Sequence, residues 1–194
     1  MEYFFYDSYY IGSYLESLNN ADLITVKRSM LTVEFEIKIS RADLINEIKA
    51  IKEAVKIYKK GFKSAAELQK YIWSEWRKER KEELKISCTK FGKHRRYLHA
   101  KKFKEYVSDF VPNEFYFCVP KKLKDVALQG IEDTPYGVYG YWKFKLSGEE
   151  RFGFEIVKKA QKITTEKIDL ETVLHLARKA SNDCYLLRRE KEEK

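Results

Sequence analysis

The chain has 194 residues, of which 44% are hydrophobic and 15% aromatic, and its formal net charge is +9. This length suits one domain with a buried core, and this apolar content excludes an intrinsically disordered chain. No apolar run approaches the roughly 18 residues of a membrane span, and the first ten residues lack the basic start and apolar centre of a signal peptide. The sequence predicts a single domain over 1–194 without a membrane segment.

Three cysteines, Cys88, Cys118 and Cys184, lie far apart and form no CxxC pair. An odd number at this spacing argues against a disulfide framework and against a zinc knuckle. The pattern favours a reducing compartment, so we expect the protein in the cytoplasm.

The first third of the chain predicts a helix followed by a β-hairpin. Apolar residues at helical spacing predict a helix over 8–18, and a β-rich run predicts a strand over 23–26. Residues 31–39 then alternate, so that the odd-numbered apolar residues share one face while Glu34, Glu36 and Lys38 share the other. The polar residues between the two strands predict the connecting turn.

Two capping-box patterns predict helices after this hairpin. Ser40 with Asp43 begins a helix that Gly61 ends, and its apolar stripe is either core or an oligomer interface. Ser64 with Glu67 begins a second helix, which is expected to run to about residue 83.

The segment from Leu84 to Lys104 holds eight lysine or arginine residues, two histidines and no acid. Because clustered cations release the counterions condensed on phosphates, such a segment is typical of a nucleic-acid-binding surface, with a solubilising face as the alternative. Gly92 is expected to interrupt it before a short helix near 99–108. The residues expected to contact nucleic acid here are Lys90, Lys93, His94, Arg95, Arg96, Lys101 and Lys102.

The last third predicts strands over 114–119, 136–145 and 151–157, with Gly148 in the turn between the last two, and a helix over 169–189. The aromatic residues of the second strand are expected to pack within the sheet. The order of elements predicts an α/β (α+β) domain with a mixed sheet flanked by helices. The helical stretch over about 61–98 is an insertion or a small subdomain.

Asp22, Glu36 and Lys38 form the pattern with the most specific chemistry. Acids on adjacent strands can bind one ion if they share a face, because paired strands lie about 4.8 Å apart. Mg²⁺ usually takes one or two carboxylates together with water and phosphate oxygens, and the Ile37 carbonyl could be a third ligand. A lysine two residues after the glutamate can orient a metal-bound water or stabilise charge on a phosphate. Glu34, on the same face, is an extra ligand, a solvent-facing residue or an ion-pair partner.

The order of Asp22, a gap and then "EIKISRADLINEIK" resembles the PD-(D/E)XK superfamily of nucleases, which have the restriction-endonuclease-like fold. The later "KKFKEYVSDFVPNEFYFCVPKKL" and "YGVYGY" are similar to motifs of its MmcB-like DNA-repair subgroup. The resemblance covers about half of the chain. The family pattern also has a strand before the aspartate, which the sequence does not make evident, and in many members an acid on the first helix, for which Glu16 is the nearest candidate.

This resemblance implies that Asp22 and Glu36 hold Mg²⁺ or Mn²⁺ and that Lys38 serves the attacking water. Ser40 and Arg41 would lie beside the site at a helix start, where free N–H groups favour a phosphate. The expected function is metal-dependent hydrolysis of DNA in repair, restriction, or mobile-element or phage biology, with RNA as a further possible substrate. Many relatives cut two strands as dimers, so a homodimer or a protein partner is an alternative to a monomer, and the sequence leaves the oligomeric state open. The rival interpretation is a nucleic-acid-binding or protein-binding adaptor that has the same fold and does not cut.

Overall fold

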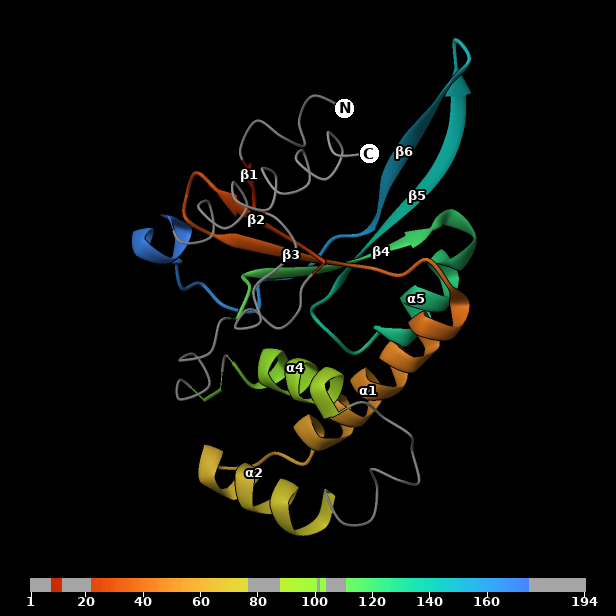
Figure 1. Ribbon diagram of the computed structural model, residues 1–194. Coiled ribbons are helices and arrows are strands. Elements are labelled where there is room, and N and C mark those ends of the chain that lie inside the picture. The colour runs from red at the N-terminus through yellow and green to blue at the C-terminus, as the bar shows by residue number, and fades with distance from the viewer. Residues whose placement is uncertain (1–7, 12–21, 77–87, 101, 104–110, 175–194) are drawn as a thin grey trace, which may run out of the picture.

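The computed structural model describes residues 8–11, 22–76, 88–100, 102–103 and 111–174, and a mixed sheet of six strands lies at its centre (Figure 1). The strands lie side by side in sequence order: β1 Ser8–Ile11, β2 Leu23–Lys27, β3 Thr32–Ile37, β4 Glu114–Pro120, β5 Gly137–Leu146 and β6 Glu149–Lys158. Strands β3, β4 and β5 pair in parallel, and the other neighbours pair antiparallel. The predicted α/β class with a mixed sheet is therefore confirmed.

The prediction of a helix over 8–18 is wrong for its first part, because Ser8–Ile11 forms β1 and pairs with β2. Two tyrosines and an isoleucine favour a strand, and β2 offers an open row of backbone groups to pair with. Helical spacing within so short an aromatic run therefore gave the wrong period. Residues 12–18 and Glu16 lie outside the described residues.

The predicted hairpin of β2 and β3 is confirmed, with Leu23 opposite Phe35 and Ile24 opposite Glu34. Met30 turns the chain with a φ of 64°, and its N–H donates to the Lys27 carbonyl at 2.8 Å. Since opposite residues share a face, this register places Asp22 opposite Glu36 by extension of the ladder.

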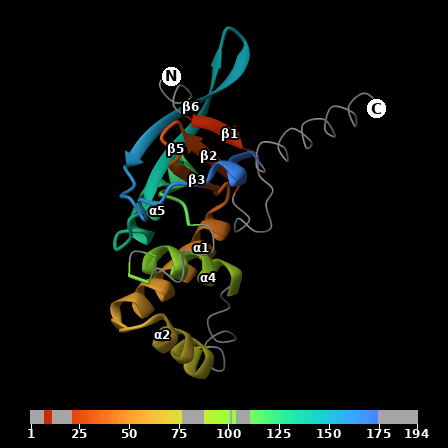
Figure 2. The same ribbon diagram turned by 90° about the vertical axis from the view of Figure 1, so that its left-hand side faces the viewer.

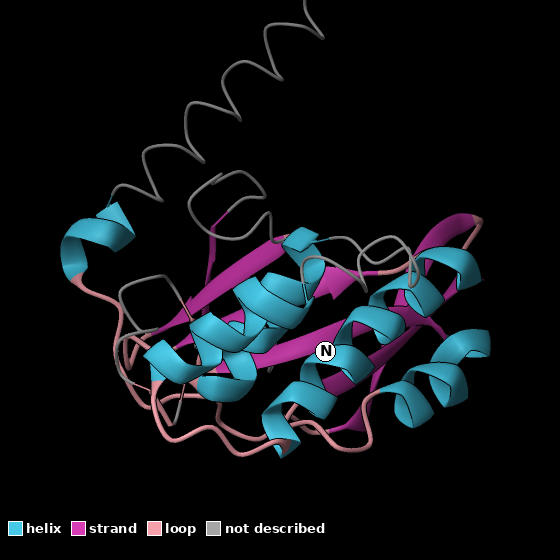
Figure 3. Ribbon diagram, turned by 90° about the horizontal axis from the view of Figure 1, so that it is seen from below, coloured by secondary structure: helices cyan, strands magenta, loops and turns pink. Residues whose placement is uncertain are grey.

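The described helices labelled in Figure 1 lie on one side of the sheet, as Figure 3 also shows from below. They are α1 Arg41–Lys59, α2 Ala65–Tyr71, α4 Cys88–His99 and α5 Lys124–Gly130, with a π-helical turn Ile72–Trp76 and a 3₁₀ turn Lys121–Leu123. Within the described part of the chain, none of the helices combines the length and the apolar character that a membrane crossing requires.

Both predicted capping boxes begin helices. Ser40 Oγ accepts from the Asp43 N–H at 3.2 Å and begins α1, while Ser64 Oγ accepts from the Glu67 N–H at 3.1 Å and begins α2. Past the end of α1, Gly61 has a φ of 74°. The stripe of α1 is core for most of its length, because four of its five residues are buried; these are Leu44, Ile48, Ile51 and Val55.

The prediction that Gly92 interrupts the basic segment is wrong, because α4 runs through it. Gly92 costs helix stability without breaking the helix, since α4 packs on α1 and tertiary contacts outweigh a weak propensity. The remainder of the predicted helix over 99–108 falls largely outside the described residues. Phe91, Tyr97 and Leu98 from α4 belong to the main core.

The main core lies between the helices and one face of the sheet. Its strand residues include Phe115, Phe117 and Val138, which are fully buried. A smaller apolar cluster lies on the other face, where the Phe35 ring stacks on Tyr116 at a centroid distance of 5.6 Å. Strand β3 is thus covered on both faces over much of its length.

The hairpin of β5 and β6 extends beyond the rest of the sheet (Figure 2). Its turn is Ser147–Gly148, and both residues have positive φ, of 54° and 83°. This conformation matches the right-handed twist of the two strands, which explains why Gly148 was a reliable turn signal.

Candidate active site

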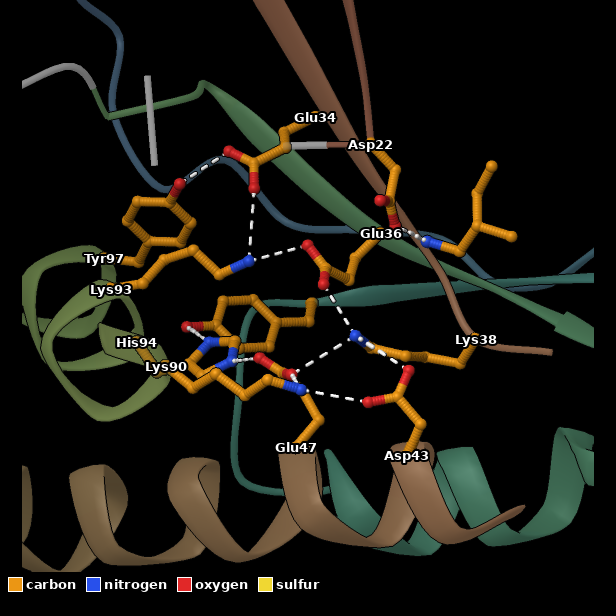
Figure 4. A network of polar contacts seen from close by, with 12 residues as sticks. Asp22, Glu34, Glu36, Lys38, Asp43, Glu47, Lys90, Lys93, His94 and Tyr97 are labelled. Carbon is orange, nitrogen blue, oxygen red and sulfur yellow. Dashed lines mark hydrogen bonds and ion pairs between the residues drawn. The ribbon is translucent and has the colours of Figure 1, made fainter. Parts of the chain in front are cut away.

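The polar face of β3 is turned toward the helices and not toward solvent. Glu34, Glu36 and Lys38 are 0%, 7% and 3% exposed, whereas Ile37 on the other face is 42% exposed. Figure 4 shows these side chains enclosed between β3, α1 and α4. Removing a charge from water costs free energy, so buried charged groups are normally paired, and the partners of each group define the site.

Asp22 closes the open end of the β2–β3 ladder beside Glu36. Its Oδ2 accepts a hydrogen bond from the Ile37 N–H at 2.6 Å. Loss of hydration, with the Glu36 carboxylate adding to it, raises the pKa of Asp22, although the Ile37 hydrogen bond acts in the opposite direction. Asp22 thus lies at the ladder position opposite Glu36, and Lys38 donates to Glu36, so the three residues of the pattern lie at one end of the β2–β3 hairpin.

Lys38 is surrounded by carboxylates. Its Nζ donates to Glu36 Oε1 at 2.6 Å and lies 3.3 Å from Glu47 Oε2 and 3.4 Å from Asp43 Oδ2. Burial alone would lower the pKa of Lys38, but the three carboxylates outweigh it and raise that pKa. The side chain is therefore an ammonium ion at neutral pH.

Helix α4 supplies two more lysines to the same network. Lys93 Nζ donates to Glu36 Oε2 at 2.7 Å and lies 3.6 Å from Glu34 Oε1. Lys90 Nζ lies 2.7 Å from Glu47 Oε2 and 3.0 Å from Asp43 Oδ1. Each Glu36 oxygen thus contacts a lysine, one from its own strand and one from α4.

A buried hydrogen-bond chain connects this network to the main core. His94 Nε2 lies 2.6 Å from Glu47 Oε1, and His94 Nδ1 lies 3.1 Å from the Tyr136 hydroxyl. Burial lowers the pKa of His94 although the Glu47 hydrogen bond opposes this, so the ring is neutral. The neutral ring then donates from Nε2 to Glu47 and accepts at Nδ1 from Tyr136. Burial would raise the pKa of Glu47, but the His94 hydrogen bond and the neighbouring lysine charges lower it well below its usual range.

Glu34 lies at the inner end of the network. Its Oε2 accepts a hydrogen bond from the Tyr97 hydroxyl at 2.5 Å. Its other oxygen lies near Lys93 Nζ, so Glu34 is an ion-pair partner, which is one of the three roles expected for it. Complete burial raises the pKa of Glu34 from 4.5 to about 7, although Lys93 and Tyr97 act to lower it. Glu34 is therefore close to half protonated at neutral pH.

Among the described residues that Figure 4 labels, acids outnumber lysines. Figure 4 labels five carboxyl groups, those of Asp22, Glu34, Glu36, Asp43 and Glu47, and three lysines, Lys38, Lys90 and Lys93. Even with Glu34 protonated, the carboxylates outnumber the ammonium groups. This excess of negative charge favours a cation at the solvent-facing edge of the network, where Asp22 lies.

Asp22 and Glu36 are the two carboxylates that were expected to hold Mg²⁺ or Mn²⁺. Asp22 and Glu36 are hard oxygen ligands, and Mg²⁺ commonly takes two carboxylates and completes its shell with water and phosphate. Because both Glu36 oxygens contact lysines, a bound cation would share or displace one of these contacts. In the part of the chain that the structure describes, no group of three or more His, Cys, Asp or Glu side chains is arranged to hold a metal.

The expected nucleic-acid contacts divide into three groups. The prediction is wrong for Lys93 and His94, because they are 5% and 0% exposed and their polar groups face Glu36 and Glu47. The residues that are at least partly exposed, and for which the contact stays a prediction, are Ser40, Arg41, Lys90, Arg95, Arg96 and Lys102. Lys101 lies outside the described residues.

Sequence reasoning missed Glu47, Tyr97 and Tyr136 as members of the network. A signal for two of these was present, because Lys90, Lys93, His94 and Tyr97 follow the i, i+3, i+4, i+7 spacing of one helix face. Asp43 and Glu47 likewise lie one turn apart on α1. A charged strand face together with two charged helix faces indicates a buried ion network. The basic composition of residues 84–104 instead suggested a surface that contacts nucleic acid.

Comparisons of the chain with models of protein families, with curated proteins and with solved structures found no match.

Proposed function

We propose that the protein is a metal-dependent nuclease of the PD-(D/E)XK superfamily, with the restriction-endonuclease-like fold, that hydrolyses phosphodiester bonds of DNA. The observation that carries the proposal is the placement of Asp22 beside Glu36 at the end of the β2–β3 ladder, with the Lys38 ammonium 2.6 Å from Glu36. Strand β1 adds support, because it supplies the strand that the family pattern has before the aspartate. The roles in repair, restriction, or mobile-element or phage biology belong to the same proposal.

Each side chain has a role that follows from its surroundings. Asp22 and Glu36 hold the divalent cation, with the Ile37 carbonyl as a third oxygen. The bound ion supplies Lewis-acid stabilisation of the phosphate and lowers the pKa of water. Lys38 remains protonated because of its carboxylate neighbours, so it stabilises charge that develops on the phosphate and does not remove a proton from water.

The start of α1 completes the proposed site. Ser40 and Arg41 are exposed and immediately follow the strand end that carries Lys38. A helix N-terminus presents free N–H groups and a partial positive charge, which favour a neighbouring phosphate of the substrate. Arg41 adds a full positive charge at the same place.

The test is cleavage of plasmid and single-stranded DNA in Mg²⁺ or Mn²⁺ by the wild-type protein and by Asp22→Asn. Asparagine keeps an oxygen that can accept from the Ile37 N–H but removes the charge, and Asp22 is exposed, so the variant folds. The matched control is Asp133→Asn, which removes an exposed carboxylate that pairs with Lys59 at 2.7 Å. We expect cleavage by the wild type and the control and at least a hundredfold less by Asp22→Asn. No cleavage in either metal, or an active Asp22→Asn, contradicts the proposal.

A non-cutting adaptor that binds nucleic acid or a protein is the second candidate. The observation that favours it is that each Glu36 oxygen already contacts a lysine, as in a structural ion network. It predicts salt-dependent DNA binding without cleavage, and the same preparations tested for cleavage distinguish the two functions.

A further inference from the structure

The β5–β6 hairpin exposes an aromatic surface that the proposed active site does not use. Phe152, Phe154 and Ile156 are 43%, 56% and 56% exposed on one face of β6. Tyr141, which is partly exposed, lies opposite Phe154 on β5, and Lys143 lies opposite Phe152. We call Tyr141, Lys143, Phe152 and Phe154 the hairpin platform. The expectation that the aromatic residues over 136–145 pack within the sheet therefore holds for Tyr136 and Tyr139 but not fully for Tyr141, Trp142 and Phe144, which are partly exposed.

The rings of the hairpin platform lie close together. Centroid distances are 6.3 Å between Tyr141 and Phe152, 6.5 Å between Tyr141 and Phe154, and 6.5 Å between Phe152 and Phe154. Neighbouring aromatic rings on a sheet face are an arrangement on which successive unpaired bases can stack, whatever their sequence.

A cation borders these rings. Lys143 Nζ lies 5.4 Å from the centre of the Phe152 ring, on the same face of the hairpin. Lys143 Nζ has an exposed contact of 3.3 Å with Glu150, on the same face. Such an exposed ion pair contributes little, so a phosphate can replace the Glu150 carboxylate.

The charge of the chain decides between two occupants of this face. A second copy of the chain would bring one net charge of +9 against another, which disfavours association. A polyanion is attracted instead, and a single strand offers both the phosphates and the unpaired bases that this surface suits.

The hairpin platform also extends from the edge of the sheet that carries the proposed site. Ile37 pairs with Cys118, Cys118 with Tyr139, and Pro120 with Tyr141, so the platform begins just past the ends of β3 and β4. With strands about 4.8 Å apart, β5 lies roughly 10 Å from β3. The platform lies on the face of the sheet that carries Ile37, opposite the helices, so a strand bound along the hairpin would pass around the end of β3 to reach the exposed Asp22.

We propose that the hairpin platform binds single-stranded DNA by stacking its bases on Tyr141, Phe152 and Phe154. This rests on the proposed function in that it names the substrate class of the same protein, but it is tested by binding alone. A chelator prevents metal-dependent cleavage, so the binding assay tests the hairpin platform whether or not the protein is a nuclease.

The experiment measures fluorescence anisotropy of a labelled 20-nucleotide oligo(dT) at low salt with a chelator. The full-length proteins are the wild type, the double variant Phe152→Ala/Phe154→Ala, the double variant Phe152→Leu/Phe154→Leu, and the control Leu146→Ala. Leu146 is 48% exposed on the opposite face of the same hairpin. All of these substitutions replace exposed side chains, so thermal unfolding should be nearly unchanged.

We expect both double variants to bind oligo(dT) at least about tenfold more weakly, because stacking needs the ring and not its apolar area. Leu146→Ala should bind as the wild type does, and binding of a blunt duplex should change less than about twofold, since its bases are already stacked. The proposal is overturned if the wild type does not bind oligo(dT), if the alanine variant binds it unchanged, or if the leucine variant keeps full affinity. Light scattering that shows a wild-type dimer, a monomeric alanine variant and unchanged DNA affinity would identify a second copy as the occupant instead.

Discussion

Replacing Glu34 by glutamine tests whether the buried Glu34 carboxyl group is protonated in the folded protein. The substitution keeps the shape of the side chain and an oxygen that accepts from Tyr97, and it removes the negative charge. The pKa of Glu34 is raised by burial from 4.5 to about 7. Between these two pH values the folded protein therefore binds more protons than the unfolded chain does, so the stability of the wild type falls as the pH rises.

The size of the effect follows from that shift. Each pKa unit corresponds to about 1.4 kcal/mol, so ionisation of Glu34 should cost the wild type about 2 to 3 kcal/mol of unfolding free energy between about pH 5 and pH 8. Glu34→Gln avoids this cost. We expect the variant to match the wild type near pH 5 and to be more stable by about 2 kcal/mol near pH 8.

The assay is urea unfolding of both proteins at the two pH values, followed by tryptophan fluorescence and circular dichroism. Other titrating groups, such as His94 with its lowered pKa, are present in both proteins and largely cancel in the comparison. Glu150→Gln, on the exposed hairpin, is the control and should show no dependence of its effect on pH. If Glu34→Gln is destabilised equally at both pH values, Glu34 is an ionised counter-ion of Lys93 throughout and the reasoning is refuted.

Two further pairs of variants test the packing and the ion network by chemical unfolding. Gly92→Ala in α4, where a Cβ meets nothing within 4 Å, should stabilise the protein by about 0.5 to 1 kcal/mol, whereas Gly130→Ala, whose Cβ would lie 2.4 Å from Ile48 side-chain atoms, should destabilise it by about 1 to 3 kcal/mol. Equal effects of the two alanines would contradict the packing described here. Lys93→Met should cost about 3 to 5 kcal/mol because it removes the buried counter-ion of Glu34 and leaves Glu36 with Lys38 alone, while Lys59→Met, at an exposed ion pair, should change stability by less than about 1 kcal/mol. A loss of stability well below this range in Lys93→Met would indicate that the network readily takes up protons or water.

Much of the sheet was predictable because its signals are local. The alternation of β3, the capping boxes of Ser40 and Ser64 and the turn at Gly148 each depend on residues within a few positions of one another. The burial of the polar face of β3 was not predictable in this way, since alternation gives the two faces but not which one is covered. That choice depends on α4, whose Lys93 contacts Glu34 and Glu36 from more than fifty residues away.

In the candidate site, too, the parts set by local signals were predictable and the parts set by long-range contacts were not. The pairing of Asp22 with Glu36 follows from hairpin register and could be read from the sequence. The roles of Lys93 and His94 could not, because a basic segment has the same composition whether its charges face a phosphate or a buried carboxylate. Composition alone therefore placed them on the surface, and the three-dimensional partners placed them inside.

The ion network also has a consequence for cooperativity. Helix α1 brings acids to β3 and α4 brings bases, and Lys90 of α4 pairs with Asp43 and Glu47 of α1, so either helix docked alone would hold charges whose partners lie on the other. A partly folded chain with one helix docked would hold uncompensated charges away from water, which is costly. Docking of α1 and α4 on β3 is therefore close to all-or-none. States with only one helix docked, which a purely apolar interface would tolerate, are strongly disfavoured.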